Sequence, residues 1–440
     1  MTDATVDGAV VPGRAVPRRD IGLKKRYAAE RRFQAYGIAA IAIGLIFLAI
    51  LLWSVISKGY TSFFQTEIRL PITYSEQVID PKNQRADDPR ILARPLAYQK
   101  LARESLYKLL GIDPQDKAAT RLAGSLLSDG APAQVSRVVQ ADLTAINETR
   151  EVWVYTSGAV DSVVKGQFDV SIEESRRPIK DAQLQWIEQL RASGHLQQNF
   201  NWGFFTNGAS SRAETSGVGV AVVGSLTMIL VVLVLALPLG VAASIYLEEF
   251  APKNRFTDLI EVNINNLAAV PSIVYGILGL AVFIGYLGMP RSASLVGGLV
   301  LTLMTLPTII IATRAALKAV PPSIRSAALG LGASKMQTVF QHVLPLAMPG
   351  ILTGTIIGLA HALGETAPLL LIGMKAFVAD YPSTPLDASS ALPVQIYLWS
   401  IEADRAFVER TSGAIIVLLV FLAVMNVSAI LLRRRFERRW

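Results

Sequence analysis

The sequence predicts an all-α polytopic membrane protein that carries one mixed α/β domain outside the membrane. Charged residues make up only 17% of the 440 residues, whereas soluble domains contain about 25%. The mean hydropathy is +0.41. Six apolar stretches reach the length that a helix needs to cross a bilayer. Clusters of lysine and arginine flank the first and the last of these stretches, as expected for segments beside membrane spans.

Residues 1–34 are predicted to form a basic cytoplasmic tail. The formal net charge of the chain is +8, a balance that also occurs in nucleic-acid-binding proteins. The basic runs here lack the interleaved aromatic residues of a nucleic-acid-binding surface, and their places beside apolar stretches explain them. Residues 35–57 are predicted to be the first transmembrane helix. Its apolar run is longer than that of a signal peptide and lacks small residues at a cleavage site, so we expect an uncleaved anchor.

Residues 58–213 are predicted to form a periplasmic domain, because the first span should run outward from the cytoplasm. Charges are frequent there and no apolar run reaches spanning length. Residues 96–112 and 180–194 have helical periodicity, and residues 151–160 and 167–172 are typical of strands. No catalytic group of residues stands out. The chain has no cysteine and only three scattered histidines, so neither a disulfide nor a metal site is expected.

Residues 214–432 are predicted to form the membrane domain, followed by a second basic cytoplasmic tail at 433–440. An even number of spans places both termini on one side, and the loops at 248–258 and 314–335, which both contain basic residues, place that side in the cytoplasm. The second of the five further spans is interrupted by Pro271. These five spans are expected at Val218–Tyr246, Val262–Tyr286, Ala293–Ala312, Ala347–Met374 and Gly413–Leu432.

Two features of this membrane domain suggest function. Residues 320–345 begin with a basic, apolar segment that is too short to cross a membrane. It predicts an amphipathic helix that starts after two prolines, lies on the membrane surface or in a groove of a partner, and ends at Gly330 or Gly332. Further on, His361 and Glu365 are four residues apart and share one face of an apolar helix. A carboxylate inside a span costs about 2.5–3.5 kcal/mol, which makes it a candidate functional residue.

The first feature resembles the EAA loop of ABC-importer permeases, because Ala327, Ala328 and Gly332 are followed at the family's spacing by Leu344-Pro345. The resemblance implies the fold of type I ABC importers and a coupling helix that docks on a cytoplasmic ATPase. Ser326 departs from the pattern, which usually has glutamate there. The coupling residues implied are Arg325, Ser326, Ala327, Ala328, Gly332, Leu344 and Pro345.

The second feature, from His361 to Leu369, resembles the GETAPL signature of the PstA family of phosphate-transport permeases. The resemblance covers about residues 214–432. It implies a permease subunit of an ATP-driven inorganic phosphate importer that is not an enzyme by itself. The residues implied to line the substrate pathway are Glu365, His361, Thr366 and Gly364. Relatives commonly have arginine where His361 stands. Residues 58–213 depart from the compact family form and resemble an N-terminal extension found in some bacterial members.

The resemblance also implies partners in the bacterial inner membrane and on both sides of it. These are a second permease (PstC-like), an ATPase dimer (PstB-like) and a periplasmic phosphate-binding protein (PstS-like). The chain has no Walker A motif, so we expect ATP and Mg²⁺ to bind to the ATPase and no cofactor to bind here.

Two roles for Glu365 remain open at this stage. Its carboxylate either fixes a cation, such as His361 or a partner's arginine, or accepts a hydrogen bond from protonated phosphate, which ionised sulfate cannot donate. A purely structural contact is the alternative for both residues. Three other functions are also open: a permease for phosphonate, molybdate or sulfate, a membrane-anchored sensor, and an ion-coupled secondary transporter.

Overall fold

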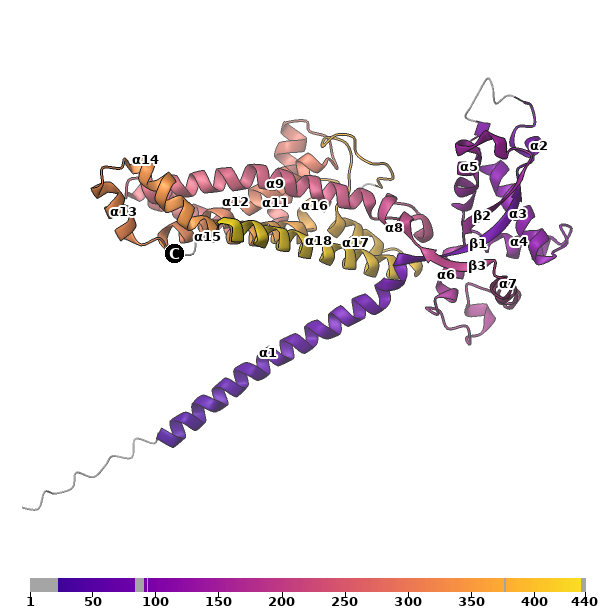
Figure 1. Cartoon of the computed structure of the whole chain (residues 1–440), viewed down its shortest axis with the longest axis horizontal. Coiled ribbons are helices and arrows are strands. Elements are labelled where there is room, and N and C mark those ends of the chain that lie inside the picture. Colours follow the sequence, from indigo (N-terminus) through magenta and orange to yellow (C-terminus); the bar gives the residue numbers. More distant parts are fainter. Residues whose placement is uncertain (1–22, 84–90, 93, 376, 437–440) are drawn as a thin grey trace, which may run out of the picture. The chain divides into compact units, whose positions relative to one another are not determined.

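The computed structural model describes residues 23–83, 91–92, 94–375 and 377–436. The chain divides into two compact units, Met1–Ser54 and Val55–Trp440. Helix α1 (Leu23–Gly59) begins in the first unit and ends in the second (Figure 1). Its apolar part is long enough to cross a membrane, as predicted for residues 35–57. Of the predicted tail, residues 23–34 belong to α1, and residues 1–22 lie outside the described residues.

Strand β1 (Phe64–Thr73) is the centre of a three-stranded antiparallel sheet with the order β2–β1–β3. Its neighbours are β2 (Thr149–Tyr155) and β3 (Leu196–Phe200). Ile68 is in register with Val154 of β2 and with Leu196 of β3. Alternate side chains of β1 point to one face of the sheet and are fully buried, because helices cover that face.

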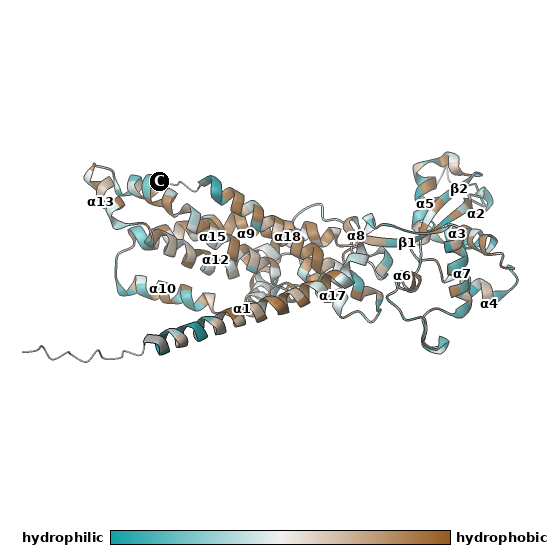
Figure 2. Ribbon diagram, turned by 60° about the horizontal axis from the view of Figure 1, so that its bottom comes forward, coloured by the Kyte–Doolittle hydropathy of each residue, from teal (hydrophilic) through white to brown (hydrophobic). Residues whose placement is uncertain are grey.

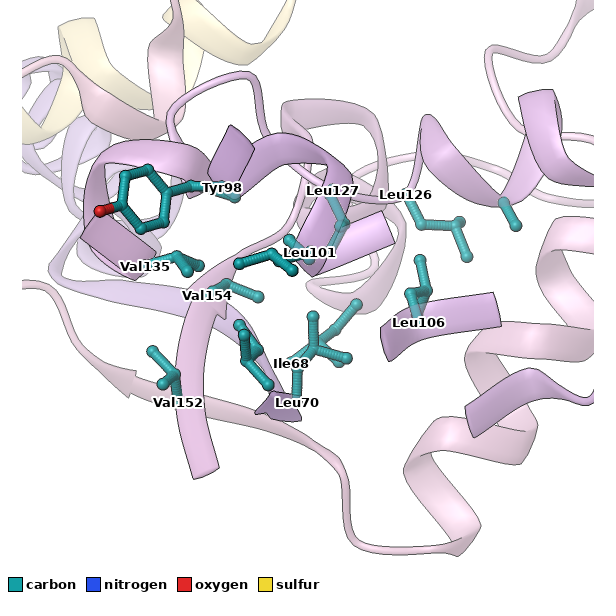
Figure 3. Close-up of a cluster of buried hydrophobic side chains, with 14 of the residues drawn as sticks. Ile68, Leu70, Tyr98, Leu101, Leu106, Leu126, Leu127, Val135, Val152 and Val154 are labelled. Atoms are coloured by element: carbon teal, nitrogen blue, oxygen red, sulfur yellow. The ribbon is translucent and has the colours of Figure 1, made fainter. Parts of the chain in front are cut away.

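The covering helices and the sheet enclose one hydrophobic core (Figure 3). Aliphatic side chains of α3 and α5 meet those of β1 and β2, and each fully buried side chain contributes about 1.5–3 kcal/mol. The phenol of Tyr98 donates to the carbonyl of Leu92, so its polar end is satisfied at the edge of this core. The helices of this domain are α2 (Glu76–Ile79), α3 (Pro95–Leu110), α4 (Lys117–Gly124), α5 (Ala131–Ala141), α6 (Gly158–Val164), α7 (Asp181–Ala192) and α8 (Trp202–Thr206).

The structure confirms two of the four elements predicted in this domain and corrects the others. Helices α3 and α7 lie where 96–112 and 180–194 predict them. The strand predicted at 151–160 ends at Tyr155, and helix α6 follows. The strand predicted at 167–172 is wrong. Asp169 there accepts hydrogen bonds from the backbone N–H and the hydroxyl of Ser171, which makes a turn in place of extended pairing.

Four long apolar helices form the main body of the membrane domain (Figures 1 and 2). Helix α12 packs against both α9 and α15, and α18 packs against α15. Small residues allow these close approaches. A Cβ added to Gly354 of α15 would lie 2.2 Å from the Cβ of Ala312 in α12, for example. The four helices are α9 (Gly219–Ile245), α12 (Ser294–Lys318), α15 (Leu344–Gly364) and α18 (Ala406–Phe436).

The predicted span at 262–286 is a bent pair of helices. α10 (Arg255–Ala268) and α11 (Ser272–Gly279), which continues as a π-helix over Leu280–Tyr286, meet at 99°. Pro271, which has no backbone N–H to donate, lies at the bend. Within the described residues, five helices are long and apolar enough to cross a membrane. The number becomes six, as predicted, if the bent pair is one span.

The predicted span at 347–374 is wrong in its extent, because α15 ends at Gly364. A short helix, α16 (Ala367–Leu371), follows after a break. In a continuous helix, the nitrogen of Pro368 would have to donate to the carbonyl of Gly364, and proline has no hydrogen there. Glu365 is therefore at the end of a helix and not in its middle. The remaining α-helices are α13 (Pro322–Gly330), α14 (Lys335–Gln337) and α17 (Leu392–Ser400), and a π-helix over Thr338–Val343 joins α14 to α15.

Candidate functional site

The break between α15 and α16 carries the first candidate site. Nε2 of His361 lies 2.9 Å from Oε1 of Glu365. The His361 side chain is 63% exposed, whereas that of Glu365 is 18% exposed. Glu365 itself has extended backbone angles, φ −77° and ψ 128°, which turn the chain out of α15. The structure thus brings the two predicted residues together at a helix end, where the imidazole covers the carboxylate.

Thr366 and Gly364 complete the four residues predicted for a substrate pathway. The Thr366 side chain makes no capping hydrogen bond, and its backbone carbonyl accepts from the N–H of Leu370 at 3.0 Å. The Thr366 hydroxyl is therefore not used to cap α16. A Cβ added to Gly364 would meet nothing within 4 Å. Open space thus adjoins the histidine–glutamate pair.

Helix packing fixes the position of this break. Helix α16 lies against α11, and a Cβ added to Gly276 of α11 would come within 2.6 Å of the Cα of Pro368. Only a glycine allows this approach. On the other side of the break, Ala362 and Leu363 are buried in the core of the membrane domain. The pair is therefore held on two packed helices, and it is not part of a free loop.

The predicted coupling segment forms the second candidate site. Helix α13 starts at Pro322, the second of the two prolines that were expected to precede it, and ends at Gly330, one of the two predicted ends. Gly332 follows with φ +87°, a conformation that side chains with a Cβ rarely adopt. Helix α14 then begins with a capping box between Ser334 and Gln337. Leu344 and Pro345 are the first two residues of α15, so the segment leads directly into the helix that carries His361.

Arg325 connects α13 to two other helices. One of its terminal nitrogens lies 2.7 Å from Oε1 of Glu249, in the π-helix Tyr246–Phe250 at the end of α9. Its terminal nitrogens also donate to the carbonyls of Leu317 and Val320, at the end of α12. The side chain of Arg325 is thus directed into the membrane domain. Ser326 and Ala327, the next two predicted coupling residues, are exposed, and Ala328 is buried.

Sequence reasoning missed two acidic residues, Glu248 and Glu249. Glu248 lies 3.5 Å from Nε of Arg314 and 3.6 Å from Nζ of Lys318, and Arg314 also contacts Glu261. The available signal was a pair of adjacent carboxylates directly after an apolar span. With Arg325, these side chains form a network of charges that joins α9, α10, α12 and α13.

Apolar side chains beyond this network are exposed. Leu331, directly before Gly332, is 91% exposed, and Leu329, Met336 and Phe340 are exposed as well. Lys335 lies over the ring of Phe250, 5.2 Å from its centroid, and links the same segment to the end of α9. An exposed apolar surface on a segment held by charges is suited to docking on another protein.

Comparison with known proteins identifies the class of this membrane domain. Residues 236–440 match a family described as "binding-protein-dependent transport system inner membrane component". The chain is 32% identical over 260 residues to the phosphate transport system permease protein PstA 1 of Mycobacterium tuberculosis, and this match covers 58% of the chain and 83% of that protein. The chain belongs to this family of binding-protein-dependent permeases. It is therefore a multi-pass inner membrane component of a transport system and not a catalytic enzyme.

Other relatives agree with this assignment. The chain is 30% identical over 212 residues to a probable PstA of Methanocaldococcus jannaschii, covering 47% of the chain and 73% of that protein. It is 29% identical over 239 residues to YqgI, a probable ABC transporter permease of Bacillus subtilis, covering 51% of the chain and 81% of that protein. Residues 20–174 match a domain of unknown function, DUF3333. As an ABC-importer permease, the chain works with a second permease, an ATPase and a binding protein.

Proposed function

We propose that this permease is a subunit of an ATP-driven importer of inorganic phosphate. The observation that carries the choice of phosphate is the similarity to permeases named for phosphate transport in two mycobacterial species and an archaeon. In this proposal the partners are a PstC-like permease, a PstB-like ATPase dimer that binds ATP and Mg²⁺, and a PstS-like phosphate-binding protein. Both termini lie in the cytoplasm, and residues 58–213 lie on the opposite side of the membrane.

The His361–Glu365 pair, with its exposed histidine, supports a path between two permeases. A titratable pair that faced lipid would be costly, because hydrocarbon cannot solvate a charge or a polar hydrogen. Such pairs in membrane domains normally face a partner helix or a water-filled cavity. The His361 side chain is exposed and the described chain offers it only Glu365. The exposed side of α15 at His361 is therefore the side that we assign to the second permease and to the substrate.

Glu365 has a chemical use in such a path. Phosphate near neutral pH keeps at least one O–H, which can donate a hydrogen bond to a carboxylate, whereas ionised sulfate has no such donor. A buried acceptor left without a donor costs about 1–3 kcal/mol, so a partly buried Glu365 would favour phosphate over sulfate. His361 covers the carboxylate at 2.9 Å and would return to it after the anion leaves. Thr366 and Gly364 contribute a hydroxyl and open space beside the pair.

The segment 320–345 is suited to coupling. Its exposed apolar residues would dock on the ATPase, and Arg325 would transmit the movement to α9 and α12 through Glu249 and two carbonyls. Leu344 and Pro345 connect the same segment to α15. A closure of the ATPase could then move α9, α12 and α15 together, as alternating access requires. Ser326, where the family usually has glutamate, is exposed, and Glu249 supplies the nearest carboxylate to α13 from another helix.

The test is uptake of labelled phosphate at low concentration in cells that lack the permease and then regain it. We expect uptake to depend on the chain and to yield to unlabelled phosphate but not to sulfate, molybdate or phosphonate. Glu365→Gln should lower the uptake rate at least about tenfold, since it removes a charged acceptor worth more than 1.4 kcal/mol. Glu402→Gln, at an exposed position outside the path, is the matched control and should keep the wild-type rate.

Three results would contradict the proposal or one of its parts. Uptake that ignores loss of the permease would remove the transport function altogether. Uptake that depends on the permease but yields better to another oxyanion would keep the ABC permease and remove phosphate as its substrate. Wild-type uptake by Glu365→Gln would reduce the His361–Glu365 pair to a structural contact.

A further inference from the structure

A cavity of about 840 Å³ opens between the sheet domain, which contains strands β1, β2 and β3, and the segment that leads into α18. Residues 403–406 form one wall, and α3, α4 and the start of α6 form others. Neither His361 nor Glu365 lines it. Its wall is rich in one side chain, arginine: Arg103, Arg121, Arg176, Arg177, Arg212 and Arg405.

Most of this positive charge is not neutralised within the described part of the chain. Arg212 is paired with Asp129, and Arg177 is paired with Asp181. The other four arginines have no carboxylate within ion-pair distance among the described residues. Three acidic residues line the cavity, and all three are engaged. Besides Asp129, Glu214 accepts from the hydroxyl of Ser128 at 2.6 Å, and Asp404 accepts from the N–H of Ala406 at 3.0 Å.

Polar donors accompany the arginines. Nε of Arg177 is buried and has no hydrogen-bond partner among the described residues, although the arginine's terminal nitrogens are bonded. A buried donor without an acceptor costs free energy. The hydroxyl-bearing residues Ser157, Ser162 and Ser175 line the same cavity. Arginine forks and hydroxyls bind phosphate oxygens in other proteins, because the guanidinium donates several directed hydrogen bonds and each hydroxyl donates one.

The size of the cavity narrows the class of ligand. Its volume lies within the range of about 300–1,000 Å³ that is usual for small-molecule sites, and it is much larger than one orthophosphate requires. Phe168 is the single aromatic residue in the described lining, so a nucleobase would find no pair of rings to stack on. We propose that this cavity binds a small multivalent phosphate-class oxyanion, such as pyrophosphate or tripolyphosphate, through its arginines.

The position of the cavity connects such a ligand to the permease. Helix α6 begins at Gly158 on the cavity wall, and its Asp161 and the following Lys165 lie in a buried ion-pair cluster with Glu409 of α18. Residues 403–406 also run directly from the cavity into α18. A bound anion would hold α6 and the start of α18 in one arrangement, so the site is suited to regulation from outside. This inference does not depend on which anion the permease transports.

The experiment is equilibrium dialysis of labelled pyrophosphate against the full-length chain in lipid nanodiscs. We expect saturable binding, with tripolyphosphate as a strong competitor and orthophosphate as a weak one. The double variant Arg103→Gln, Arg121→Gln should bind at least about tenfold more weakly, because it removes two charge-assisted donors. The matched control is Lys100→Gln, Lys117→Gln, which removes the same charge from the same two helices outside the cavity and should stay within about twofold of wild type.

Several results would overturn the inference. Absence of saturable binding up to about 10 mM pyrophosphate would remove the site. If both double variants bind pyrophosphate equally weakly, the loss of affinity results from the lower net charge of the chain and not from the loss of a site in the cavity. Tighter binding of orthophosphate than of pyrophosphate would show that the ligand is not a multivalent oxyanion of the pyrophosphate class. If the arginine double variant unfolds at a lower temperature than wild type, Arg405→Gln, in the segment before α18, replaces it with the same expectation. Phosphate uptake by the permease would survive each of these failures.

Discussion

Nζ of Lys165 lies 2.9 Å from Oε1 of Glu409, although the two residues are 244 positions apart in the chain. The same nitrogen lies 2.7 Å from Oδ2 of Asp161, and the Lys165 side chain is only 2% exposed. The neighbouring Arg410 is also buried and donates to the carbonyl of Ser62 at 3.0 Å. Buried charges thus connect the sheet domain to the first turns of α18.

Removal of the cation should loosen this connection. Lys165→Met leaves Asp161 and Glu409 buried without their partner, and we expect a loss of about 3 kcal/mol of stability. Thermal unfolding and limited proteolysis of the full-length chain in nanodiscs measure the effect, with earlier cleavage expected near α18. Lys100→Met is the control, since its side chain is 62% exposed and 3.8 Å from Glu104. If Lys165→Met unfolds at a temperature as high as that of the control, the ion pairs of Lys165 do not contribute to stability.

Gly332 offers a test of the coupling segment. Its φ of +87° costs about 1–2 kcal/mol for a residue with a Cβ, while no atom lies within 4 Å of an added Cβ. Gly332→Ala should therefore distort the backbone without a steric clash and lower phosphate uptake per ATP hydrolysed in the reconstituted importer. Gly330→Ala is a matched control, because Gly330 has equal space, lies in α13 and lacks a positive φ. Equal coupling in the two variants would argue against a fixed α13–α14 turn.

The sequence was sufficient to predict the spans, because apolar runs of about 20 residues are typical of helices that cross a bilayer. It was not sufficient to show where a run stops being one helix. Ala347–Met374 is apolar throughout, and the break at Glu365 follows from a missing N–H at Pro368 and from packing of α16 on Gly276. Strand β1 was missed for a related reason. Its partners lie far along the chain, and pairing over such distances leaves little local signal.

The candidate sites divide in the same way. His361 and Glu365 were predicted as a pair because four residues make one helical turn. Arg325 was recognised from a motif, but its partner Glu249 lies 76 positions away in another helix, and only the fold brings the two together. The six arginines of the cavity come from five separate segments, each with one or two basic residues that look like ordinary surface charges in sequence.

Glu67 should make the stability of the sheet domain depend on pH. Burial raises the pKa of its carboxyl above 4.5, while a hydrogen bond from Asn199 partly offsets this. Glu67 therefore contributes stability that is fully present below its unfolded-state pKa and is lost as the pH rises through the higher folded-state pKa. Glu67→Gln should flatten this part of the decline, above the ordinary pKa of a glutamate, in thermal unfolding of the full-length chain. Glu151→Gln, exposed on the neighbouring strand, should retain it. An identical pH profile for wild type and Glu67→Gln would contradict the assigned shift.

The Arg325–Glu249 contact allows a charge-exchange test of coupling. Arg325→Glu alone places a second carboxylate opposite Glu249 and breaks the links to Leu317 and Val320, so transport should fall at least about tenfold in the reconstituted importer. Adding Glu249→Arg restores opposite charges, although not the two carbonyl contacts, and should recover part of the rate. Basal ATP hydrolysis should change little in either variant, because the ATP site is on the partner. Lys253→Glu is the control, since Lys253 is exposed near the same end of α9. A general loss of basic charge on this face would lower transport in Lys253→Glu and Arg325→Glu alike, and Glu249→Arg would not restore it. Recovery of transport in the double variant would therefore identify the Arg325–Glu249 contact as the coupling element.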